Sequence, residues 1–256
     1  MKEANTAAAN VSLVAFYGDK PIELIDLIER LQGKLGNHKL LGDKFIPYQM
    51  GQVHATIIGC EGLRNSQGII SQWFRERRGE EKYINFAELT NYLQQQLDLP
   101  LTICFGGYNR DRDYNFLSRD RPLYERSFQL QPAGDLTIPI LIGWSWQNNS
   151  VTSAIDKLRR SFQRFNLLHK YHATTEAIDN DFYLRLGTIN ALLSTDEIKA
   201  IASEICDLLA ASAVLIPLCS KDLAFVQYRD LQLTPATTKV VPIADITASQ
   251  LEQLYR

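Results

Sequence analysis

His54 and Thr56 are the two residues whose types and spacing best fit chemistry on a phosphate. They lie in the segment 53–58, which is otherwise apolar and is bounded by Gly51 and Gly59. This pattern predicts a short strand. Residues two apart on a strand point to the same face, so the imidazole and the hydroxyl should project side by side. Together they could transfer a proton and donate a hydrogen bond to one phosphate oxygen.

A His-x-Thr triplet also arises by chance, and a histidine on a strand can simply be a half-buried side chain. The chain contains only four histidines, so His54 has few possible partners. A second copy of the triplet, His172-Ala173-Thr174, lies in the stretch 170–179, whose composition is typical of a turn. Two interpretations are open: a coincidence in a loop, or a loop that folds back so that His172 supplies an acid.

Composition limits the classes of protein to be considered. The 256 residues are 45% hydrophobic and 22% charged, which suffices for one two-lobed domain or two small ones. The net charge of -2 provides no basic coat for nucleic acid and no polybasic membrane anchor. No apolar run is long enough to span a membrane, and no signal-peptide pattern is present. Four widely spaced cysteines are expected to be reduced, without structural zinc, in a cytoplasmic protein.

Hydrophobic periodicity predicts alternating strands and helices after a disordered tail at 1–10, with one domain over 11–256. Strands are predicted at 11–17, 53–58, 101–107, 126–131, 135–146, 181–189, 214–218 and 223–228, and 231–233 could continue the last edge. Helices are predicted from Pro21 to Leu35, at 85–97, from a cap in 148–150 to Leu168, after Ser194 and at 248–255.

Local signals add detail to these helices. Asp19 can cap the first helix, and Ser194 with Glu197 fits a capping box. Four basic residues fall mostly off the apolar face of the helix that ends at Leu168 and are expected in solvent: Lys157, Arg159, Arg160 and Arg164. The segment 72–79, QWFRERRG, is either a solvated helix face or a basic lip with aromatic residues suited to phosphates.

Strands that return as hairpins favour an α+β fold with antiparallel sheets over a doubly wound parallel sheet. The two halves of the chain show a similar order of elements, which suggests a pseudo-duplicated fold. The sequence contains no P-loop, no dinucleotide-binding glycine pattern and no acidic cluster with metal-ligand spacing. We therefore expect neither a cofactor nor a metal.

This order, with His54-Ala55-Thr56 on the strand after the first helix, resembles the 2H phosphoesterase superfamily, which includes relatives of 2'-5' RNA ligase and 2',3'-cyclic phosphodiesterase. The segments that carry the resemblance are 11–17, the helix after Pro21, and VHATIIGCEG at 53–62. It implies a bilobal fold in which two antiparallel sheets face a central cleft, with helices outside. Each lobe would supply one His-x-Thr/Ser motif. One imidazole would activate water or a ribose hydroxyl, the other would protonate the leaving oxygen, and the hydroxyls would hold the phosphate without a metal.

The second motif of that family corresponds by position to 183–187, Tyr-Leu-Arg-Leu-Gly. Tyr183 stands where the family has histidine, and Arg185 stands where it has Thr or Ser. Tyrosine, with a pKa of about 10, is a poor base that can donate a hydrogen bond, whereas arginine binds phosphate without exchanging a proton.

Three functions are therefore considered. The first is an enzyme acting on 2',3'-cyclic or 2'-5' phosphodiesters of RNA or nucleotides, with His54 as acid/base, Thr56 holding phosphate, and His172 or Tyr183 completing the site. The second is a degenerate relative that binds a nucleotide, an RNA end or a protein without turnover. Its phosphate cradle would be His54, Thr56, Tyr183 and Arg185. The third is an α+β interaction protein in which the triplet at His54 only packs.

Overall fold

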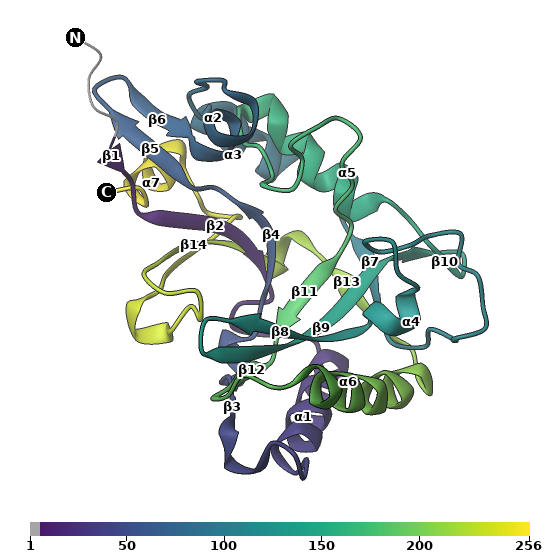
Figure 1. Ribbon diagram of the computed structural model, residues 1–256. Helices are drawn as coiled ribbons and strands as arrows, with labels where there is room; N and C mark the ends of the chain where they lie inside the picture. The colour runs from purple at the N-terminus through teal and green to yellow at the C-terminus, as the bar shows by residue number, and fades with distance from the viewer. Residues whose placement is uncertain (1–5) are drawn as a thin grey trace.

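Antiparallel strands form the body of the protein, which a computed structural model describes over residues 6–256 (Figure 1). Every strand pairing in this range is antiparallel, and the strands are interspersed with helices. The predicted α+β class is therefore confirmed. The expectation of two sheets is not met, because the described residues form sheets of eight, four and three strands.

The eight-stranded sheet is organised around β9, a strand of 12 residues (Leu136–Gln147) that is almost entirely buried. Strands on both sides of it, and at its ends, pair with β9, so this one segment joins most of the sheet. Glycine is required at position 143 of β9, because a Cβ there would lie 2.7 Å from the carbonyl oxygen of Cys104. The other strands are β3 (Phe45–Pro47), β7 (Leu101–Phe105), β8 (Phe128–Ala133), β10 (Ser150–Val151), β11 (Phe182–Arg185), β12 (Gly187–Ile189) and β13 (Val214–Leu218).

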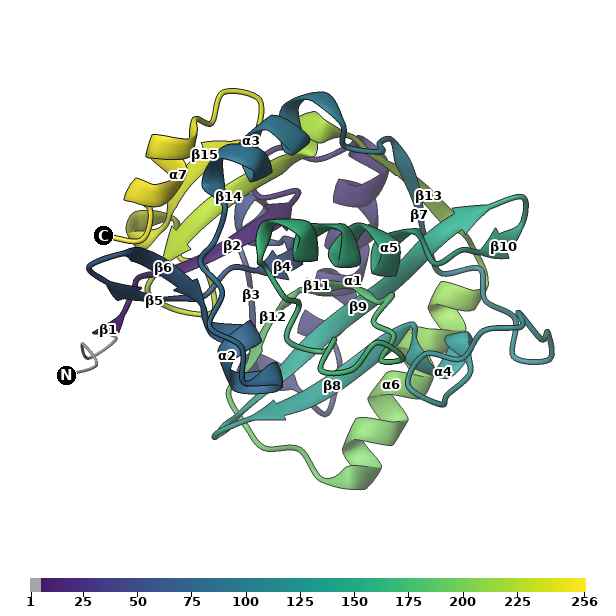
Figure 2. The ribbon, with the colours of Figure 1, turned by 90° about the horizontal axis from the view of Figure 1, so that it is seen from above.

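The four-stranded sheet carries the His54 segment at one edge. Its order is β15-β14-β2-β4, and it comprises β2 (Asn10–Ala15), β4 (Ala55–Gly59), β14 (Leu223–Tyr228) and β15 (Lys239–Pro242). The edge strand β4 packs beside β11 of the large sheet, as Figure 2 shows from above. The two predicted motif strands therefore meet where the two sheets meet. A small third sheet consists of β1 (Thr6–Ala7), β5 (Gly62–Asn65) and β6 (Gly68–Ser71).

Helices cover the sheets, and one of them lies between two sheets. Helix α1 packs on β3 and β13, and its buried residues are Leu24, Leu27, Ile28, Leu31 and Leu35. Ile22, at its first turn, is exposed. Helix α5 contacts β4 of one sheet and β9 of the other. The helices are α1 (Ile22–Gly36), α2 (Gln72–Arg78), α3 (Phe86–Gln95), α4 (Leu123–Arg126), α5 (Ala154–Ser161), α6 (Thr195–Ala210) and α7 (Ala248–Gln253). Short 3-10 turns occur at Gly42–Lys44, Met50–Gln52, Phe162–Phe165, Ser220–Asp222 and Pro235–Thr237.

Local signals predicted some boundaries well and others wrongly. The capping box of Ser194 and Glu197 is present at the start of α6. Helix α1 begins after Pro21 without a side-chain cap, so Asp19 does not cap it. The predicted tail is partly wrong, because residues 6–7 form β1 and β2 begins at Asn10, whereas residues 1–5 lie outside the described range.

Two further segments differ from prediction because of turns. Asn148 and Asn149 adopt positive φ angles of 51° and 59° in the turn between β9 and β10, so α5 starts later, with Ser153 as N-cap. The stretch 231–233 is not a strand. A side-chain oxygen of Asp230 accepts backbone N–H groups from this stretch and the residue after it, which forms a turn, and β15 takes the place beside β14 instead.

Candidate functional site

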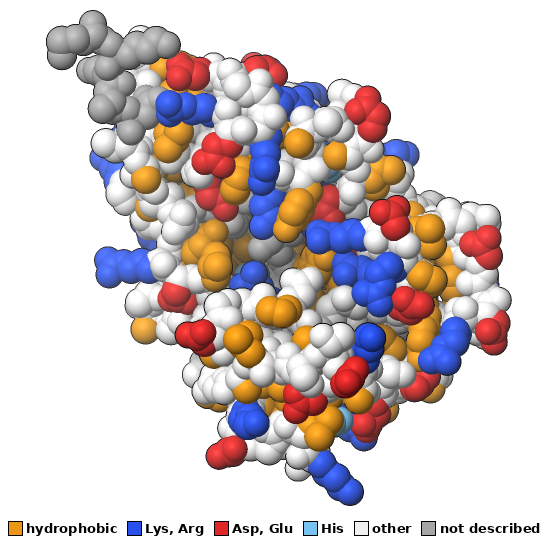
Figure 3. Space-filling model, viewed as in Figure 1, with side chains coloured by type: hydrophobic (Ala, Val, Ile, Leu, Met, Phe, Trp, Pro, Cys, Tyr) orange, Lys and Arg blue, Asp and Glu red, His pale blue; other side chains and the backbone are white. Residues whose placement is uncertain are grey.

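A cavity of about 190 Å³ lies between the four-stranded and eight-stranded sheets, where β4 is beside β11. Figure 3 shows a hollow in the middle of this face, with Lys and Arg side chains at its rim. Four of the five site residues predicted from sequence line this cavity: His54, Thr56, Tyr183 and Arg185. Tyr183 and Arg185 point to one face of β11, as the period of two in a strand requires. Thr56 lies in β4, whereas His54 precedes it by one residue, so the strand begins two residues later than the predicted 53–58.

His54 is held as a neutral imidazole with one defined tautomer. It is 7% exposed, and its Nδ1–H donates to the carbonyl oxygen of Gln52 at 2.7 Å, which leaves the lone pair on Nε2. Burial, together with the charges of Arg185 and Lys20, lowers the pKa of His54 to about 4. At neutral pH His54 can accept a proton, and a bound anion would raise its pKa.

Thr56 and Arg185 offer hydrogen-bond donors to the cavity. Thr56 is exposed, and its hydroxyl has no hydrogen-bond partner among residues 6–256. Arg185 donates one long hydrogen bond, 3.3 Å from Nη1 to the carbonyl oxygen of Leu231, and pairs with no carboxylate in the same range. Its charge is therefore not neutralised, and a guanidinium in this state is suited to a phosphate.

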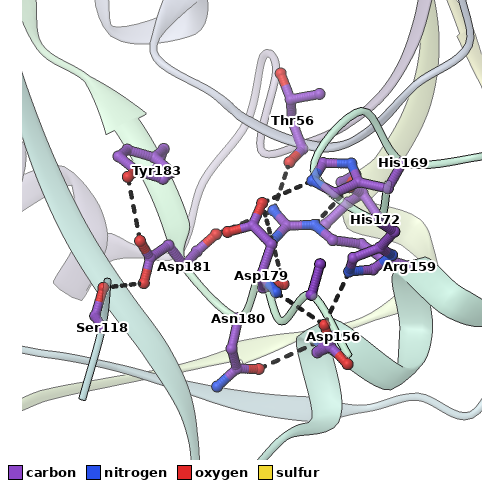
Figure 4. Close-up of polar contacts among 12 residues, drawn as sticks. Thr56, Ser118, Asp156, Arg159, His169, His172, Asp179, Asn180, Asp181 and Tyr183 are labelled. Atoms are coloured by element: carbon purple, nitrogen blue, oxygen red, sulfur yellow. Dashed lines mark hydrogen bonds and ion pairs between the residues drawn. The ribbon is translucent and has the colours of Figure 1, made fainter. Parts of the chain in front are cut away.

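Tyr183 lines the cavity, but its hydroxyl is occupied elsewhere. It accepts a hydrogen bond from Arg126 Nη2 at 2.7 Å. It donates to Asp181 Oδ2 at 3.1 Å, as Figure 4 shows. Burial, reinforced by the Asp181 carboxylate, raises the pKa of Tyr183 to about 12. The phenolic proton is therefore directed away from any ligand, and Tyr183 is poorly placed to act as the missing acid.

His172 is not brought to the cavity. It is fully buried, and its Nε2 donates to Asp156 Oδ1 at 2.9 Å. Its backbone is also fixed, since its N–H donates to the carbonyl oxygen of His169 and its own carbonyl accepts from Arg78. Of the two interpretations of the second triplet, the one in which the loop 170–179 folds back to present His172 as an acid is therefore wrong, because the loop turns this ring inward.

Arg159, expected in solvent, is a central buried residue of the site. It is 2% exposed and lies on α5. Its guanidinium donates to the carbonyl oxygens of Ile57 at 2.8 Å and Thr56 at 3.1 Å on β4 (Figure 4). It also donates to those of Asp179 at 2.8 Å and Asp181 at 3.0 Å, which precede β11. Arg159 thus joins the two motif strands, and it is buried because α5 contacts both sheets.

His169 and Asp179 form a pair at the same place. The distance from His169 Nε2 to Asp179 Oδ2 is 2.6 Å, and both residues line the cavity. Burial and the nearby Arg159 lower the pKa of His169 to about 4. Burial alone would raise the pKa of Asp179, but Arg159 and His169 hold it well below its usual range. No spacing pattern in the sequence marks this pair, because the triplet at 172–174 directs attention to the neighbouring histidine.

The cavity has an excess of positive charge on a chain whose net charge is negative. Its lining includes four cations and two carboxylates, which leaves an excess of two positive charges while its two histidines are neutral. The charged lining residues are Arg119, Arg159, Lys170, Arg185, Glu61 and Asp179. Because apolar strands surround these charges, the local potential favours an anionic ligand.

The basic segment 72–79 forms helix α2, which Gly79 ends in a left-handed conformation with φ of 67°. Its side chains have protein partners: Trp73 Nε1 donates to Glu61 at 2.6 Å, and Arg78 Nη2 donates to the carbonyl oxygen of His172 at 3.0 Å. None of the arginines of this helix lines the cavity.

Within residues 6–256, no group of three or more His, Cys, Asp or Glu side chains is arranged to hold a metal ion. None of the helices described here has the length and apolar character needed to cross a membrane.

Comparison with known proteins gives little further information. No family model matches the chain, and no curated protein does. Among solved structures, the chain is similar to the crystal structure of TT0787 of Thermus thermophilus, with 12% identity and a TM-score of 0.40. The match covers 91% of this chain and 93% of that chain.

Proposed function

We propose that the chain is a 2H phosphoesterase-like protein whose cavity binds the phosphate of a nucleotide or an RNA end without efficient turnover. In this proposal residues 11–256 form one bilobal, pseudo-duplicated domain in the cytoplasm. The observation that supports it is the convergence of two motifs on one positively charged cavity: His54–Thr56, which begins one residue before β4, and Tyr183–Arg185 on β11. The four free cysteines suit a reducing compartment.

Binding follows from the donors that the cavity offers. The Arg185 guanidinium would donate to two phosphate oxygens, and the Thr56 hydroxyl would donate to a third. His54 Nε2 has no proton at neutral pH, and the negative charge of the ligand favours its protonation. Protonated His54 would then add a further charge-assisted hydrogen bond.

Turnover is disfavoured because neither Tyr183 nor His172, the two residues expected to complete the site, is placed to release a proton into the cavity. The Tyr183 hydroxyl donates to Asp181, its pKa is about 12, and His172 is buried away from the cavity. His169 is bound to Asp179. The leaving oxygen of a phosphodiester would have to take its proton from solvent, which gives up the rate gain of about 10²–10⁴ that a positioned general acid supplies.

A second candidate function is slow, metal-independent hydrolysis of a 2',3'-cyclic phosphate. The tautomer of His54 favours it, because the lone pair on Nε2 is free to accept a proton from attacking water. The water oxygen would form a bond to phosphorus, the bond to one ribose oxygen would break, and that oxygen would be protonated by solvent.

Calorimetric titration with nucleoside 2',3'-cyclic phosphates in the presence of a chelator tests both functions, with product analysis of each mixture. The proposal predicts binding without turnover and about tenfold weaker binding in Arg185→Gln. Arg112→Gln is the matched control, because Arg112 stacks on Tyr114, 4.8 Å from its ring centre, and is not part of the cavity lining. Turnover that His54→Ala abolishes would favour the second function. Absence of both binding and turnover would leave only an interaction protein.

A further inference from the structure

Arg119 reaches the cavity from a tight turn that sequence analysis does not mark as functional. Ser118 and Arg121 form an isolated antiparallel bridge, and between them Arg119 and Asp120 have positive φ angles of 50° and 62°. Neither turn residue is glycine, so the turn is costly for the backbone. It places the Arg119 guanidinium over the ring of Tyr183, 5.6 Å from its centre, where it lines the cavity.

The hydrogen-bond donors of Arg119 remain available. Its nearest carboxylate oxygens are Asp181 Oδ2 at 3.6 Å and Asp179 Oδ1 at 4.0 Å, both beyond hydrogen-bond length. Each carboxylate has a closer arginine: Arg126 lies 2.9 Å from Asp181, and Arg159 lies 3.3 Å from Asp179. Arg119 makes no hydrogen bond within residues 6–256, and its side chain is 44% exposed. Its position is thus fixed by rings and charge, while its N–H groups can serve a ligand.

Lys170 converges on the same point. Its Nζ lies 4.8 Å from the centre of the Tyr171 ring, and the Arg119 guanidinium lies 4.9 Å from the same centre. Lys170 has no ion pair or hydrogen bond within the described part of the chain, and it also lines the cavity. Because both cations line the cavity, an anion bound there would be attracted by both of them.

This cationic pair is separate from the donors at His54. Arg119 stacks on Tyr183, whereas Arg185 is two residues further along the same face of β11, with about 7 Å between the Cα atoms of residues 183 and 185. Such a spacing is of the order of one nucleotide step. We propose that Arg119 and Lys170 form a second phosphate subsite, so that the cavity takes a nucleoside with phosphate groups at both its 2',3' and 5' positions. This inference rests on the proposed function, which supplies the first subsite.

The test compares adenosine 2',3'-cyclic phosphate with and without a 5'-phosphate, by titration calorimetry at fixed ionic strength. The wild-type protein should bind the 5'-phosphorylated compound about tenfold more tightly. Arg119→Gln should remove this gain, and it should weaken the compound without 5'-phosphate much less than Arg185→Gln does, because only the general charge of the cavity is reduced for that compound. Arg185→Gln should weaken both compounds, and Arg112→Gln should weaken neither.

The outcomes separate the two proposals. Equal affinities in the wild-type protein, or a gain that persists in Arg119→Gln, would overturn the second subsite. If Arg185→Gln still weakens binding in that case, the first subsite and the proposed function stand. If neither compound binds the wild-type protein, or if Arg185→Gln leaves both affinities unchanged, the proposed function fails and the inference built on it fails as well.

Discussion

Replacement of Arg159 by leucine is expected to destabilise the protein more than any surface substitution. The change removes the donors for four backbone carbonyls and the 3.3 Å ion pair with Asp179. Loss of one partner of a buried ion pair costs roughly 3–5 kcal/mol, and a buried carbonyl left without a donor adds about 1 kcal/mol or more. Since some carbonyls will find other donors, we expect a loss of about 5 kcal/mol in the free energy of unfolding.

Urea denaturation followed by circular dichroism measures this loss. With a slope of about 3 kcal/mol per molar urea, the midpoint should fall by about 1.7 M. Arg159→Lys keeps the charge beside Asp179 but supplies fewer donors, so its midpoint should fall by about half as much. If Arg159→Leu does not fold, the midpoint of Arg159→Lys still measures the contribution of the guanidinium.

Arg164→Leu is the matched control. Arg164 stacks on Tyr92 with its guanidinium 4.7 Å from the ring centre, and it is exposed. Its loss should cost about 0.5–1 kcal/mol. If the midpoints of Arg159→Leu and Arg164→Leu coincide, the argument that one buried guanidinium joins β4 to the segment before β11 is refuted.

The same interaction gives a pH dependence with a defined sign. Although burial alone would raise it, the pKa of Asp179 is held below its ordinary value by Arg159 and His169. A carboxyl group whose pKa is lower in the folded state stabilises the protein above its unfolded pKa of about 3.9 and loses this contribution as the pH falls. Acid denaturation of Arg159→Leu should therefore depend less steeply on pH below about 4 than that of the wild-type protein, whereas Arg159→Lys, which keeps the positive charge, should retain most of the dependence.

Three further predictions concern other groups. Burial lowers the pKa of both His54 and His169 to about 4, so the unfolded state takes up protons first and the free energy of unfolding should fall as the pH drops from about 6.5 to 4. Urea titrations across this range should show that His54→Gln removes about 3 kcal/mol of that fall. Tyr183→Phe should lower stability by about 1 kcal/mol and change the affinity for a cyclic phosphate by less than twofold, since its hydroxyl faces the buried network; a larger affinity change would show that the hydroxyl contacts the ligand. A thiol-reactive aromatic disulfide should modify only Cys219 in the folded protein, because the other three thiols are buried, and all four after denaturation; rapid modification of a second thiol would contradict the burial.

Local pattern in the sequence determined much of the framework. Alternation in 53–58 placed His54 and Thr56 on one face, the same period at 183–185 placed Tyr183 and Arg185 on one face, and all four side chains line one cavity. The apolar face of α1 and the capping box of Ser194 also followed from neighbouring residues. These features depend on interactions within a few residues of one another, which is why they could be predicted.

The tertiary structure alone decided which charged residues complete the site. Periodicity assigned Arg159 to solvent, but α5 lies against two sheets, so the side of the helix that would otherwise be solvated is buried as well. The turn at 118–121 brings Arg119 to Tyr183, and the loop 170–179 turns His172 inward and leaves His169 at the cavity. Each of these contacts joins residues far apart in the chain, so the conformational preferences of neighbouring residues could not predict them.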